Sequence, residues 1–222
     1  MISRMAAEFA NRTEAGRALA RKLGEFAGRS DVLVLALPRG GVPVAYEVAE
    51  SLKVHLDVLL VRKIGVPEQP ELAMGAIASG GGYTINREVV DEMHITAAEF
   101  GAVLQRESEE LHRRERVYRR NRPPIEIAGK TVIVVDDGLA TGSTMRAAVA
   151  ALRRMQPAYI IVAVPVAPAD TVYRLEALAD RVVCLLVPEP FSAVGLHYMN
   201  FGQVGDSEVR ELLEKNARRT AA

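Results

Sequence analysis

The segment VVDDGLATGST, residues 134–144, places two adjacent carboxylates just before a run of glycine and hydroxyl residues. Neighbouring negative charges repel each other, so a segment that only had to turn would gain nothing from Asp136 and Asp137 together. The apolar run 131–135 before them predicts a buried strand. Carboxylates at the end of such a strand suit a ligand with hydroxyl groups or a hydrated divalent cation.

The residues after the acids are suited to phosphate. We expect a turn over 138–142 and a helix that begins near Gly142, whose free N–H groups and positive dipole end would face an anion. The predicted phosphate-binding residues are Ala140, Thr141, Gly142, Ser143 and Thr144. A Walker A loop would need one more residue and a lysine before Ser143, and no G-x-G-x-x-G follows a strand. A phosphate site beside a site for two adjacent hydroxyl groups matches a ribose 5-phosphate.

Two other stretches could bind an anion at the same edge of a sheet. In LPRGGVPV, residues 37–44, Arg39 supplies charge, and the amides of Gly40 and Gly41 can approach a ligand closely. In VRKIGVPEQPELAMGAI, residues 61–77, Arg62 and Lys63 follow an apolar run. Each stretch alone is also compatible with ordinary solvated surface charge.

The elements that must position these residues alternate along the chain. Apolar runs predict buried strands at 32–37, 56–61, 131–135, 159–164 and 182–187, and helical spacing is found at 13–27, 42–52, 142–155 and 170–179. A hairpin is expected over 75–86, with a mobile tip at its three glycines. A long helix is expected from the capping box Thr96–Glu99 to about residue 121, where Pro123 and Pro124 would stop it. This order predicts a single α/β domain, a doubly wound and mainly parallel sheet with helices on both faces.

Composition excludes several classes of protein. The 222 residues carry 28 basic and 28 acidic side chains, so no net field attracts nucleic acid or a membrane surface. The basic run 113–122 could touch RNA, but the helix dipole already favours basic residues near a helix end. With a single cysteine, Cys184, and no apolar stretch long enough to span a bilayer, we expect a cytoplasmic protein that binds no membrane, and nucleic acid is not its expected partner.

The acid pair followed by Ala-Thr-Gly-Ser-Thr resembles the phosphoribosyl diphosphate (PRPP) signature of type I phosphoribosyltransferases. LPRGGVPVA and the Arg-Lys-x-Gly segment resemble further segments of that family, and the resemblance spans about residues 30–200. It implies transfer of a phosphoribosyl group to a small-molecule acceptor, with Mg2+ as cofactor. It implies catalytic roles for Asp136, Asp137, Arg39 and Lys63, metal binding by the two acids through water, and pyrophosphate binding by Arg39, Gly40, Gly41, Arg62 and Lys63. The family's pyrophosphate loop can contain a cis bond, which the sequence leaves open.

The resemblance also implies a core over about 30–188, a flexible lid over about 66–95 and a hood from 1–28 and 189–222. Ala140 replaces the aspartate that 6-oxopurine enzymes usually carry before Thr-Gly, and in this respect it resembles adenine-type members. Candidate acceptor residues are Glu71, Phe191, Val194, His197 and Tyr198. The aromatic cluster around Tyr198 could equally form a small satellite core.

Two functional classes follow. The first is a phosphoribosyltransferase for a nucleobase-like nitrogen acceptor. The alternative is a non-catalytic regulator that binds PRPP or a nucleotide and could also bind RNA. The sequence leaves a homodimer open, because such assemblies are common in the family.

Overall fold

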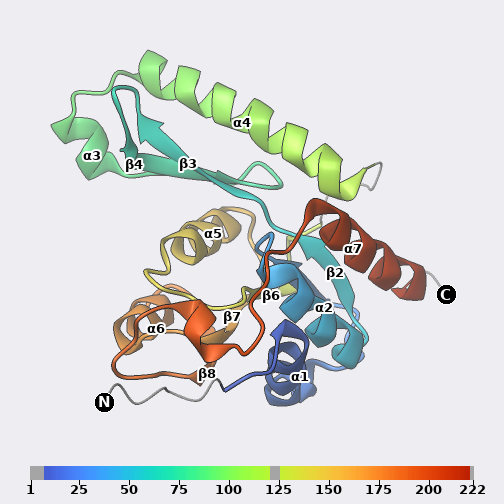
Figure 1. Cartoon of the computed structure of the whole chain (residues 1–222). Coiled ribbons are helices and arrows are strands. Elements are labelled where there is room, and N and C mark those ends of the chain that lie inside the picture. Colours follow the sequence, from blue (N-terminus) through green and yellow to red (C-terminus); the bar gives the residue numbers. More distant parts are fainter. Residues whose placement is uncertain (1–7, 121–125, 221–222) are drawn as a thin grey trace.

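The structure, a computed structural model, describes residues 8–120 and 126–220. Its main sheet has five parallel strands in the order β2-β1-β6-β7-β8 (Figure 1). The strands are β1 Val32–Ala36, β2 His55–Val58, β6 Thr131–Val135, β7 Tyr159–Val166 and β8 Arg181–Leu186. All residues of β1 and β6 are buried, because helices cover both faces, and this explains their continuous apolar sequences. The predicted doubly wound α/β fold is confirmed.

Alternate strand residues face two separate cores. Val34 and Ile133 face α1 (Arg12–Lys22), α2 (Gly41–Leu52) and α7 (Asp206–Thr220), while Leu35 and Val134 face α5 (Ser143–Arg154) and α6 (Ala169–Glu176). Helices α1 and α7 lie within the predicted hood, but their side chains pack into the main core. The described hood segments outside these two helices include 189–205, which contains the 3-10 turn Val194–His197 and contributes Val204 to the main core. Residues 1–7 lie outside the described residues.

The predicted second strand, 56–61, is wrong in its extent. Strand β2 ends at Val58, and β3 (Val61–Val66) leaves the main sheet to form a three-stranded antiparallel sheet with β4 (Gln69–Ala78) and β5 (Tyr83–Ile85). The break has a packing reason, because Leu59 belongs to the main core and Leu60 to the core of the second sheet. The two consecutive leucines therefore serve two cores.

The second sheet carries two helices, α3 (Arg87–Glu92) and α4 (Ala97–Arg119), and forms an arm above the main sheet (Figure 1). The Thr96–Glu99 capping box is confirmed, whereas the predicted end of the helix at 121–124 lies outside the described residues. The glycine turn at 80–82 does not project as a free tip. A Cβ at Gly82 would lie 2.6 Å from both the carbonyl oxygen of Ala151 and the methyl group of Met155, so this turn packs closely on α5.

The candidate site lies at the carboxyl ends of β1 and β6, where the winding direction of the sheet reverses. Strands β1 and β6 are adjacent, with Ala36 paired to Val135, but the chain leaves them toward opposite faces. Open α/β sheets bind ligands at the carboxyl ends of such strands. Within the described ranges, no helix combines the length and apolar character that crossing a membrane would require.

Candidate functional site

The acid pair after β6 lies directly against the loop after β1. A Cβ on Gly40 would overlap the Asp137 carboxylate, at 2.7 Å from its carbon, and a Cβ on Gly41 would lie 2.8 Å from the Val135 carbonyl oxygen. Both positions therefore require glycine because of this close approach. The peptide bond between Pro38 and Arg39 is cis. The two motifs, separated by about a hundred residues in sequence, form one site.

The two carboxylates occupy different environments. Asp136 accepts a hydrogen bond from the Asp137 amide at 2.9 Å, and burial together with the neighbouring charge of Asp137 raises the pKa of Asp136 well above its ordinary value. Burial also raises the pKa of Asp137, but hydrogen bonding to Arg12 opposes this shift. The hydroxyl of Tyr198 donates to the Asp137 carbonyl oxygen. The site thus holds two acids that water solvates poorly.

Arg12 is a site residue that the sequence analysis missed. Its Nε and Nη2 each lie 2.8 Å from Asp137 Oδ2, Nη1 donates to the Gly202 carbonyl oxygen at 2.7 Å, and the guanidinium lies 3.9 Å from the centre of the Phe201 ring. The sequence contained one indication that Arg12 has a role beyond the helix surface. Arg12 is the first residue of α1, where the helix dipole disfavours positive charge.

The donor set fits a magnesium ion only in combination with a substrate. The described ranges contain no group of three or more His, Cys, Asp or Glu residues placed to hold a metal, so the acid pair would need ligands from water or substrate. Mg2+ is typically held by one or two carboxylates, water and substrate phosphates. Asp136 and Asp137 are the residues that could hold it, through water.

We expect Asp136→Asn to stabilise the fold at neutral pH. Because the folded-state pKa of Asp136 lies above the unfolded value, the wild type loses stability as pH rises through that folded-state pKa. Relative to wild type, the variant should gain on the order of 1 kcal/mol at about pH 7.5, or roughly 2–4 °C in Tm, and the gain should shrink toward about pH 4. Thermal unfolding at the two pH values measures this.

Asp180→Asn is the matched control, because Arg153 lowers the pKa of Asp180 and the sign is reversed. That variant should lose stability at neutral pH. An Asp136→Asn protein that unfolds more easily than wild type at about pH 7.5 would contradict the burial argument.

We expect Arg12→Gln to move the acidic limb of the activity profile upward in pH. Arg12 lowers the pKa of Asp137, so its removal raises that pKa further, and the carboxylate becomes protonated at a higher pH. The measurement is kcat/KM against pH, with Arg17→Gln as the control, since Arg17 lies on the same helix and pairs with Glu47 at the surface. An acidic limb that does not move would argue against this coupling.

The loop over 138–142 has the geometry of an anion site. Gly142 adopts a left-handed φ of 65° and is the N-cap residue of α5, which it cannot cap because it has no side chain. The Ser143 amide of the first turn makes one long hydrogen bond, to the Thr141 hydroxyl at 3.4 Å. Two carbonyl oxygens of the loop accept hydrogen bonds from side chains. The Thr171 hydroxyl donates to the Ala140 carbonyl at 2.8 Å, and Arg146 donates to the Thr141 carbonyl at 2.7 Å. Thr141, Ser143 and Thr144 are exposed. The predicted phosphate-binding residues are thus gathered on one open turn.

The predicted pyrophosphate cations do not all come together. Arg39 and Arg62 line one cavity, which Thr144 also lines. Lys63 does not, because it lies within β3, where its ammonium group bonds to the Glu71 carboxylate at 3.0 Å. Glu71 is fully exposed on the arm. The expectation that Lys63 ends its strand beside Arg62 is wrong, since β3 continues past it.

The predicted acceptor residues of the hood form a satellite core beside the site. Tyr198 packs against Phe9 and stacks on Phe201 at 4.9 Å between ring centres, and His197 stacks on Phe191 at 5.9 Å. The side chain of Val194 would collide with a Cβ on Gly138, at 2.5 Å. The cluster therefore fixes the loop and the acid pair from one side.

A reversal point that combines two partly buried acids, a glycine loop and a helix N-terminus is typical of α/β proteins that bind phosphorylated sugars or nucleotides. The family model described as "Phosphoribosyl transferase domain" matches residues 7–198. The chain therefore belongs to the phosphoribosyl transferase family.

Known proteins resemble most of the chain. The crystal structure of TT1426 from Thermus thermophilus superimposes with a TM-score of 0.83 at 41% identity, over 94% of this chain and 98% of that one. A Mycobacterium tuberculosis protein named "Putative phosphoribosyl transferase Rv0571c" is 48% identical over 210 residues, 95% of this chain and 47% of the relative. The chain thus spans about half the length of that curated relative. "Bifunctional protein PyrR" from Chloroflexus aurantiacus is 38% identical over 129 residues, 57% of this chain and 65% of that protein.

Proposed function

We propose that the protein transfers the 5-phosphoribosyl group of PRPP to a nucleobase-like nitrogen acceptor and releases pyrophosphate in a Mg2+-dependent reaction. The observation that carries the proposal is the contact between the acid pair and Gly40–Gly41, beside the exposed turn that leads into α5. These three parts match the hydroxyls, the diphosphate and the 5-phosphate of one substrate.

In this reaction the bond between C1 and the diphosphate oxygen breaks, and a bond from C1 to the acceptor nitrogen forms. Positive charge develops on the ribose ring. Asp136 and Asp137 hold the 2- and 3-hydroxyls and place negative charge beside that ring, while Arg39 and the loop amides stabilise the leaving diphosphate. Bound Mg2+ would neutralise diphosphate charge. The acceptor nitrogen loses its proton to solvent or to a basic group.

Ala140 favours an acceptor of the adenine type. Its side chain has no carboxylate to take a proton from a 6-oxopurine, and its carbonyl is held by Thr171. We therefore place adenine ahead of hypoxanthine and guanine.

The test is pyrophosphate release from PRPP and Mg2+ with a panel of acceptors: adenine, guanine, hypoxanthine, xanthine, uracil, orotate and nicotinate. Asp137→Asn is the blank. Release that depends on one acceptor would establish both reaction and substrate. If no acceptor supports release although calorimetry shows PRPP binding, the transfer proposal for these acceptors fails.

The non-catalytic regulator is the second candidate, and the basic half of α4 is the feature that favours it. Two of its arginines, Arg113 and Arg114, line the cavity beside Arg39. RNA binding with a steep salt dependence, in the absence of turnover, would favour the regulator.

A further inference from the structure

Helix α4 brings arginines to the loop that follows β1. A cavity of about 360 Å3 lies between the end of β1, the link from β2 to β3, the second half of α4 and the start of α7. Its charged lining residues are Arg39, Arg62, Arg113, Arg114 and Asp206, four positive groups against one negative, so the formal charge of the wall is +3. Thr144 of the phosphate-type turn also lines the cavity and connects it to the proposed PRPP site.

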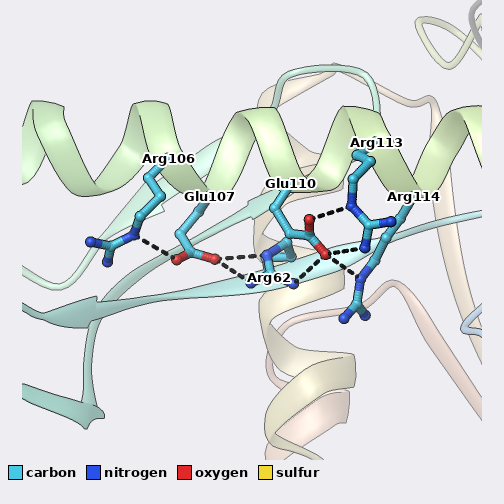
Figure 2. Close-up of polar contacts among 6 residues, drawn as sticks. All are labelled: Arg62, Arg106, Glu107, Glu110, Arg113 and Arg114. Atoms are coloured by element: carbon cyan, nitrogen blue, oxygen red, sulfur yellow. Dashed lines mark hydrogen bonds and ion pairs between the residues drawn. The ribbon is translucent and has the colours of Figure 1, made fainter.

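Two carboxylates next to the cavity, Glu107 and Glu110, pair with these arginines and lower the formal charge around the cavity from +3 to +1, so a net positive charge remains. Glu110 accepts hydrogen bonds from Arg113 at 2.7 and 2.9 Å and from Arg114 at 3.0 Å (Figure 2). These arginines lower the pKa of Glu110 to about 2, so it is ionised at neutral pH. Glu107 accepts from Arg62 at 2.7 Å, and Arg62 also lies 3.9 Å from Glu110 (Figure 2). One charge on Glu110 is thus shared among three guanidinium groups.

Arg39 is only loosely held on the opposite side of the cavity. Its Nη1 lies 3.8 Å from Asp206 Oδ1, beyond hydrogen-bond length, and that oxygen already accepts the Tyr118 hydroxyl at 2.7 Å. Within the part of the chain that the structure describes, Arg39 side-chain nitrogens donate no hydrogen bond that would compete with a ligand. Arginine on two sides of a small cavity is suited to a multiply charged, phosphate-type anion.

We propose that Arg113 and Arg114 of α4 join Arg39 and Arg62 to bind a diphosphate, the leaving group of PRPP. The inference rests on the proposed function and assigns to α4 the cations expected from Lys63. A diphosphate carries enough terminal oxygens to engage several guanidinium forks at once, whereas a monophosphate or a carboxylate engages fewer. The helix also lies on the arm, so the bound anion would join the arm to the main sheet.

The test is calorimetric titration of the full chain with inorganic pyrophosphate, without acceptor, at low and at physiological salt. The variants are wild type, Arg113→Gln with Arg114→Gln, and Arg113→Lys with Arg114→Lys. Arg106→Gln is the matched control, because Arg106 is exposed on the same helix, pairs with Glu107 and does not line this cavity. Inorganic phosphate and PRPP are titrated alongside, and thermal unfolding checks that every variant is folded.

We expect the double glutamine variant to bind pyrophosphate roughly tenfold more weakly or worse, with Arg106→Gln within about twofold of wild type. The double lysine variant should recover only part of the loss, since lysine keeps the charge but not the fork. Phosphate should bind more weakly than pyrophosphate. A folded double glutamine variant that binds pyrophosphate as wild type does would overturn the inference, and so would a wild type that binds none.

The outcomes separate this inference from the proposed function. If acceptor-dependent turnover occurs but the double glutamine variant keeps its pyrophosphate affinity and its KM for PRPP, the function stands and the α4 site is rejected. If wild type turns over no acceptor while pyrophosphate binding depends on Arg113 and Arg114, the site stands and the transferase proposal fails.

Discussion

Asp137→Asn is expected to lower pyrophosphate release by roughly 100-fold or more, the scale of losing one preorganised electrostatic group. Asparagine has the same shape and can still accept the hydrogen bonds from Arg12, so the substitution removes the charge and leaves the packing. Since that charge opposes the positive charge that develops on the ribose, kcat should fall more than the affinity for PRPP.

The measurement is kcat and KM for PRPP with the acceptor that the panel identifies. Asp31→Asn is the matched control, because Asp31 is an exposed acid before β1, paired with Arg29. A folded Asp137→Asn protein with activity within about threefold of wild type would remove Asp137 from the catalytic site.

Gly40→Ala is expected to reduce activity by about 100-fold or more while the protein stays folded. The added Cβ would overlap the Asp137 carboxylate. That carboxylate is held on its other side by Arg12, at 2.8 Å from both Nε and Nη2, so it cannot yield without breaking those contacts. A displacement of about 1 Å at reacting groups can cost roughly 100-fold in rate.

Steady-state kinetics and thermal unfolding of the variant are compared with Gly24→Ala, because a Cβ at Gly24 would meet no heavy atom within 4 Å. We expect Gly40→Ala to lose about 1–3 kcal/mol of stability, the usual range for overpacking. Activity within about twofold of wild type would show that the contact between the two motifs is not needed for the reaction.

The local sequence predicted the features that depend on neighbours in the chain. The buried strands were visible because helices cover both faces of a parallel sheet, which leaves no polar alternation in β1 or β6. The capping box of α4 and the turn before α5 follow from residues within a few positions of each other. The spacing of Asp136 to Thr144 was sufficient to predict a site for a phosphorylated sugar, and the family match agrees with it.

The other contacts of the site depend on packing between segments that are far apart in the sequence. Arg12 reaches Asp137 across 125 positions of sequence, and no local pattern specifies that contact beyond an arginine at an unfavourable helix end. Lys63 and Arg62 are adjacent in sequence, but the break at Leu59–Leu60 carries β3 into the arm, where Lys63 meets Glu71 and only Arg62 lines the cavity.

From the sequence, Arg113 and Arg114 were expected to lie at a solvated helix end. In the tertiary structure they line the cavity beside the loop after β1. The fold class and the family of this chain could therefore be predicted from its residues alone, because strands, turns and caps depend on nearby positions. The set of charges that share the site could not, because it depends on where separately folded segments pack against one another.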